Sequence, residues 1–155
     1  MELSIRHTLA TLSYRLGKVL RDAPGSFADF QIHESVRTPV QILAHVNDLM
    51  DWALTQVEGK EQWRTSSPLA WDQEIARFFG AIQKLDEEIA DRGAPAVSAD
   101  KLFQGAVADA LTHTGQLAML RRIAGIPVRP ENYSVADIVA GRAGREQAPP
   151  RYEFD

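Results

Sequence analysis

Three side chains that can bind a metal ion lie in two amphipathic segments of the chain. Asp109 and His113 are four residues apart in "DALTHTGQLAML", so a helix would place them on one face, a turn apart. His45 follows Ile42 by three residues and precedes Leu49 by four, in line with the apolar stripe of its own segment. Both patterns predict that these polar side chains point into the protein interior.

Imidazole and carboxylate together form a ligand set for zinc, nickel, iron and manganese. A buried carboxylate without a partner costs several kcal/mol, so an aspartate on an apolar stripe needs a cation or a hydrogen-bond donor. A histidine from a second helix would complete a three-ligand site with an open position for water. We therefore predict one divalent ion held by His45, Asp109 and His113. The alternative is a structural Asp–His hydrogen bond between the two helices.

Other patterns that carry chemistry are missing from the sequence. The 155 residues contain no H-E-x-x-H, G-x-S-x-G, P-loop or G-x-G-x-x-G motif. They also lack the Glu-x-x-His pairs of di-iron bundles, and one carboxylate on a buried stripe is too few for two metals, so we predict a single ion. Cysteine is absent, which excludes a disulfide, a thiolate cage and a cysteine nucleophile.

Amphipathic helices must position the three side chains. Apolar residues recur every three or four positions in four segments, which predicts four helices of roughly five turns. Thr38–Pro39 and Ser67–Pro68 are cap-plus-proline start signals, Ser98 is a further N-cap, and Gly125 follows the last turn. The predicted helices cover residues 3–22, 39–57, 68–91 and 98–124.

These segments predict an all-α fold. Residues 1–125 are expected to form a four-helix bundle, and residues 126–155 an irregular C-terminal extension that packs on it within a single domain. The extension has one short helical possibility at residues 134–140. No run of alternating residues is long enough to compete as a strand.

Composition narrows the function classes. The net charge is −4, and Lys and Arg are spread along the chain, which argues against a nucleic-acid partner. The opening "MELSIRHTLATL" has a polar residue every two or three positions, so we expect neither a signal peptide nor a membrane span in it. We expect a soluble, cytoplasmic protein.

Four further side chains have types that occur in functional sites: Trp52, Gln116, His33 and His7. Trp52 shares the face of His45, which favours a core or pocket-wall role. Gln116 follows His113 by three and could contact that ligand or a substrate, or be an ordinary exposed glutamine. His33 lies in a loop that could border a pocket, and His7 is expected to be solvated.

Two stretches resemble the DinB-like superfamily. They are "TPVQILAHVNDLMDWAL" around His45 and "DALTHTGQLAMLRRIAGIPV" around His113, and the tail "PENYSVADIVAGRAGREQAPPRYEF" extends the resemblance over most of the chain. In that superfamily a four-helix bundle carries a divalent metal on one histidine of the second helix and an H-x-x-x-H pair of the fourth. His45 and His113 match the first and last of these ligands, and Asp109 stands where a histidine is expected.

The resemblance implies a mononuclear metalloenzyme. Relatives include thiol-dependent S-transferases and maleylpyruvate isomerases, so a thiol transfer, an isomerisation or a hydrolysis is expected, with a low-molecular-weight thiol among the substrates. Zinc or nickel is the expected metal, with iron or manganese as alternatives, and a homodimer is expected. The competing hypothesis is a non-catalytic bundle, either a stress-related interaction module or a small-ligand binder with a structural Asp–His cluster.

Overall fold

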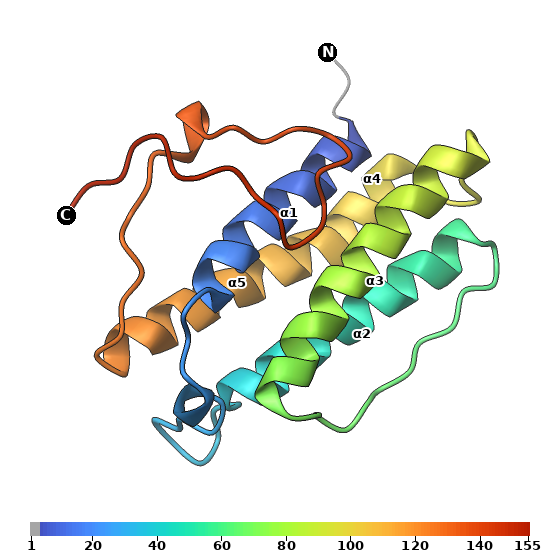
Figure 1. Ribbon diagram of the computed structural model, residues 1–155. Coiled ribbons are helices and arrows are strands. Elements are labelled where there is room, and N and C mark those ends of the chain that lie inside the picture. The colour runs from blue at the N-terminus through green and yellow to red at the C-terminus, as the bar shows by residue number, and fades with distance from the viewer. Residues whose placement is uncertain (1–3) are drawn as a thin grey trace.

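The computed structural model describes residues 4–155, and its regular elements are helices (Figure 1). The long helices are α1 (Ile5–Leu20), α2 (Pro39–Val57), α3 (Trp71–Arg92) and α5 (Ala108–Ile123). Shorter elements are α4 (Ala99–Leu102), the π-helical turn η2 (Phe103–Val107), and the 3₁₀ turns η1 (Gly25–Phe27) and η3 (Tyr133–Val135). Within residues 4–155 no strand forms, which confirms the all-α prediction. The expected start of the first helix, Leu3, lies outside the described residues.

The predicted start of the third helix is wrong. Pro68 does not begin it; the helix begins at Trp71, and residues 60–70 have no regular secondary structure. The side chain of Gln73 accepts a hydrogen bond from the backbone N–H of Ala70, so the first turn caps its own start. A Ser-Pro start signal three residues upstream is therefore not needed. α2, in contrast, begins at the predicted Pro39.

The core lies between the long helices. α1 and α2 each pack against both α3 and α5, and the most extensive contact is between α2 and α3. Figure 1 shows α1 and α3 crossing in front of α5 and α2. The largest fully buried side chains come from the four long helices and from α4, which supplies Leu102. Those of the long helices are Phe78, Leu9, Leu12, Leu16, Leu43, Met50, Ile82, Leu85, Leu117, Glu74 and Val46.

The segment after α5 runs back along α1 (Figure 1). Ser13 donates a hydrogen bond of 2.6 Å to the carbonyl of Ala143. Tyr14 and Lys18 donate to the two carboxylate oxygens of Glu131, at 2.6 and 2.7 Å. The Glu131 side chain has no exposed surface, so α1 holds this segment through a buried charged group. The predicted helix over residues 134–140 is only the single turn η3.

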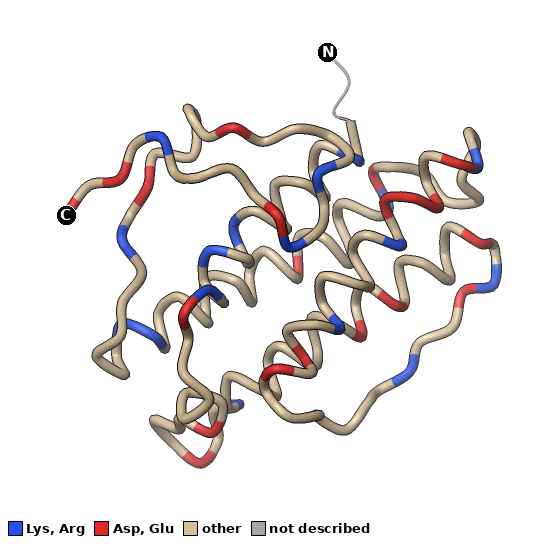
Figure 2. The backbone as a smooth tube through the Cα atoms, in the orientation of Figure 1, with Lys and Arg blue, Asp and Glu red and all other residues tan. Residues whose placement is uncertain are grey.

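Charged groups are interspersed along the chain, as Figure 2 shows. None of the helices within residues 4–155 has both the length and the apolar character that a membrane span requires. One buried ion pair joins α2 to α3: Arg77 donates to Asp48 at 2.7 Å, and the backbone and hydroxyl of Ser66 donate to the same carboxylate. This cluster fixes the irregular segment before α3 against both helices.

The Asp48 cluster makes stability depend on pH. Burial alone would raise the pKa of Asp48, but hydrogen bonds from Ser66 and Arg77 outweigh it and hold the pKa below its usual value. Such a carboxylate stabilises the fold above its unfolded pKa, about 3.9, and this stabilisation is lost as pH falls through the folded value. We expect Asp48→Asn to lower the free energy of unfolding at neutral pH by about 1–3 kcal/mol. The difference from wild type should shrink below about pH 4 in urea unfolding; a constant difference would contradict this assignment.

Candidate metal centre

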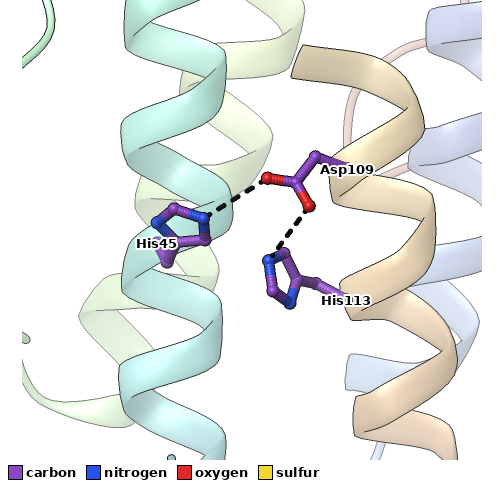
Figure 3. Close-up of side chains that lie close together, drawn as sticks. All are labelled: His45, Asp109 and His113. Carbon is purple, nitrogen blue, oxygen red and sulfur yellow. Dashed lines mark ion pairs between the residues drawn. The ribbon is translucent and has the colours of Figure 1, made fainter. Parts of the chain in front are cut away.

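The structure brings the three predicted ligand residues together between α2 and α5 (Figure 3). His45 Nε2 lies 3.5 Å from Asp109 Oδ2, and His113 Nε2 lies 3.4 Å from Asp109 Oδ1. The two imidazole rings stand edge to face with centroids 4.9 Å apart. One potential ligand atom from each residue lies within 4.8 Å of the other two. This group could hold a metal ion.

The prediction that these side chains point into the protein interior holds only in part. The side chains of His113 and His45 are 12% and 23% exposed, and that of Asp109 is 45% exposed. An uninterrupted helix would align Ala106 with Asp109 and His113, but the wider π turn η2 shifts the helical register by about one residue. The buried stripe then continues through Ala110, Thr114 and Leu117, and the candidate ligands lie beside it. They border solvent, where a small molecule can reach them.

The spacing within the group is wide enough for a metal ion between the three side chains. An N–H···O hydrogen bond spans about 2.7–3.2 Å, and both His–Asp distances are longer. Two ligand atoms that each lie about 2.0–2.2 Å from a tetrahedral ion are about 3.3–3.6 Å apart. The two His–Asp distances fall in this range but end on different oxygens of Asp109, and one ligand atom from each residue lies within 4.8 Å of the others. Both contacts are also within ion-pair distance, and Asp109 acts on the His45 imidazole as a polar partner, so a structural Asp–His cluster between the helices is the alternative to a metal site.

Neighbouring groups prepare the two imidazoles for metal binding. His113 Nδ1 donates to Gln116 Oε1 at 2.7 Å, which leaves the Nε2 lone pair on the side of Asp109. The sequence analysis offered a contact with His113 as one of the roles of Gln116, and the structure shows this contact. Burial lowers the pKa of His45, the charges of His113 and Arg37 lower it further, and Asp109 opposes them. His45 is therefore a neutral imidazole, the form that binds a metal, at neutral pH.

An aromatic pair closes one side of the site. The ring of Trp63 lies 5.8 Å from that of His45 and 5.9 Å from that of Trp52. Trp52 is half-buried and lines a cavity, as its position on the face of His45 indicated. Trp63 was not predicted, because it belongs to the irregular segment between α2 and α3, and no local pattern shows that this segment folds back over His45.

Other buried carboxylates already have protein partners. Asp48 is paired with Arg77, and Asp86 accepts two hydrogen bonds from Arg6 at 2.7 and 3.0 Å. Glu74, fully buried, accepts from the Asn47 amide at 2.6 Å. The expectation of a single buried carboxylate is therefore wrong, but these groups are neutralised or hydrogen-bonded within the fold. The prediction of one metal ion needs no change.

A cavity of about 440 Å³ opens beside His113. Apolar side chains form most of its lining, with polar atoms from Ser35, Arg37 and Gln116. His33 itself is exposed and bonded to Ser35 at 2.8 Å. It is not among the residues that line the cavity, although Ile32 and Ser35 of the same loop are. His7 is exposed on α1, as expected.

Fold and site together define an all-helical protein with a His/Asp/His group that could hold a metal ion. Comparison of the chain with protein-family models, curated proteins and solved structures found no match. The resemblance to the DinB-like superfamily thus stays a prediction that rests on the quoted sequence stretches.

Proposed function

We propose that the protein is a mononuclear metal-dependent enzyme of the DinB-like type, built as a four-helix bundle. The observation that carries the proposal is the convergence of His45, Asp109 and His113 at metal-ligand spacing. The bundle is supported by the packing of α1 and α2 against both α3 and α5. A cytoplasmic location and a homodimer are part of the same proposal, on the sequence evidence alone.

Each residue has a distinct role in this proposal. His45 and His113 would supply neutral nitrogen ligands, and Asp109 would supply one negative charge from α5. Zinc or nickel is the metal that we propose first, with iron or manganese as alternatives. A bound divalent ion would lower the pKa of a thiol or water beside it, which provides a nucleophile at neutral pH.

The half-exposed Asp109 leaves access from solvent on one side of the group, and the Trp63 ring covers His45 on another. This arrangement would admit a low-molecular-weight thiol to the ligand group while His113, held by Gln116, keeps its orientation. Thiol transfer, isomerisation and hydrolysis are the candidate reactions. The non-catalytic alternative keeps the same side chains but gives them no metal.

Metal content tests the proposal. We expect wild-type protein purified without added metal to hold about one zinc or nickel ion per chain by elemental analysis. Asp109→Ala should lose that ion, whereas Asp100→Ala, at an acidic residue in the first turn of α4, should keep it. Trace metal in the wild type that neither substitution changes would contradict the proposal. A thiol-consumption assay with a model electrophile should then show a rate that a chelator abolishes.

The hydrogen bond from His113 to Gln116 gives a second prediction. Gln116→Leu should weaken zinc binding by about 10–100-fold, because a ligand imidazole without its partner loses both its orientation and its fixed tautomer. Gln104→Leu, at an exposed glutamine of η2, is the matched control and should leave the affinity unchanged. Equal affinities of the two variants in a competition titration would show that Gln116 does not support the site.

A further inference from the structure

The cavity beside His113 has the composition of a site for an apolar molecule. Its walls include Ile42 and Leu120 at the buried end and Ile32, Met119 and Ile123 at the rim. The three rim residues are 47%, 64% and 52% exposed. Large apolar side chains rarely gather at the surface without a ligand or partner, so this rim needs an occupant.

The guanidinium of Arg37 lies between the cavity and the candidate metal centre. Arg37 lines the cavity beside His113 and also a smaller one, of about 240 Å³, beside His45. Its charge acts on His45, after burial and the charge of His113, to lower the pKa of that imidazole. Arg37 is exposed, and no carboxylate within residues 4–155 lies in ion-pair contact with it. Its guanidinium is free to bind an anion from solution.

We propose that this cavity binds a small monocarboxylic acid with an apolar body, the carboxylate on Arg37 and the body along Ile42, Met119 and Ile123. The second part of the inference, that this acid is the substrate acted on beside His113, rests on the proposed function. The binding itself does not, because Arg37 and the apolar wall belong to the protein with or without a metal.

The chemistry of the lining selects this class of ligand. Guanidinium and carboxylate match as a two-point hydrogen-bonded pair, so one arginine suffices for one carboxylate. A phosphate or a dicarboxylate would leave a second charge against apolar side chains, which is unfavourable. A sugar- or peptide-bearing thiol would bury polar groups against the same wall. We therefore place such a thiol on the solvent side of Asp109. The cavity then takes the other substrate, the monocarboxylic acid.

Binding of sodium octanoate to the full-length protein in the presence of a chelator tests the proposal without the metal. Isothermal titration should show one octanoate per chain, with binding at least about tenfold weaker for Arg37→Met. Arg122→Met, at an exposed arginine in the last turn of α5, is the matched control and should bind as the wild type does. 1-Octanol should bind equally weakly to wild type and Arg37→Met.

Met119→Asp is the second variant, since it places a carboxylate in the apolar wall, and it should also lose octanoate. Circular dichroism and urea unfolding check that both variants fold.

Octanoate binding that is absent, or unchanged by Arg37→Met and Met119→Asp, would overturn the proposal even if the protein holds a metal. If octanoate binding depends on Arg37 but the protein never holds a metal, the proposal for the cavity is supported and the proposed metal-dependent enzyme function is contradicted. A dimer in sedimentation that Met119→Asp dissociates, together with no octanoate binding, would assign the cavity to a second copy of the chain and overturn the proposal.

Discussion

Replacing His113 with alanine is expected to weaken zinc or nickel binding by more than about 100-fold. A residue that only hydrogen-bonds a ligand contributes about 10–100-fold to metal affinity, and removal of a ligand should exceed this. His113 is the least exposed of the three candidate ligands. A water molecule in its place would be a weaker ligand than the imidazole. Competition against a chromophoric chelator measures the affinity.

Two variants sharpen the result for His113. His33→Ala removes an exposed loop histidine bonded to Ser35 and should leave the metal affinity unchanged. Asp109→His restores the ligand pattern of the DinB-like superfamily and should keep one zinc ion per chain. A loss of affinity in His33→Ala equal to that in His113→Ala would place the metal elsewhere on the protein.

The second large effect is on stability. Lys18→Met should lower the free energy of unfolding by about 3–5 kcal/mol, because it leaves the carboxylate of Glu131 buried without a cation. Glu131 has no exposed side-chain surface, and Lys18, itself 8% exposed, lies 2.7 Å from it. Urea unfolding measures the change. Because this ion pair joins α1 to the segment after α5, its loss should also increase the rate at which a protease cleaves that segment.

Two further variants separate charge from packing. Lys84→Met, at an exposed lysine of α3, should change the free energy of unfolding by less than about 0.5 kcal/mol. The double substitution Lys18→Met with Glu131→Leu should cost less than Lys18→Met alone, because it removes the unpaired charge. If the double substitution were the more destabilising, the buried charge would not be the cause.

Sequence periodicity predicted the parts of the fold that depend on local patterns. α2 begins after Thr38 as its cap and proline indicated, and the i, i+4 spacing of Asp109 and His113 placed both on one face of α5. The partnership with His45 followed from its position on the stripe of α2. The first two features depend on neighbours within one or two helical turns, whereas the approach of His45 to Asp109 is a contact between α2 and α5.

The remaining features depend on packing between distant segments. The π turn η2 changes the helical register by one residue, which a periodic pattern does not reveal. Trp63 over His45 and Glu131 beside Lys18 join residues that are far apart in the chain. Arg37, just before α2, had no distinguishing motif. The sequence therefore predicted that His45, Asp109 and His113 come together, whereas their exposure and surroundings required the tertiary structure.

Anomalous diffraction from crystals soaked with zinc tests the central claim most directly. Data collected on the two sides of the zinc absorption edge locate the ion without reference to activity. The account predicts one strong peak between α2 and α5, within about 2.0–2.2 Å of a nitrogen of His45, a nitrogen of His113 and a carboxylate oxygen of Asp109. Zinc bound only at other residues, with no peak at this group, would contradict it.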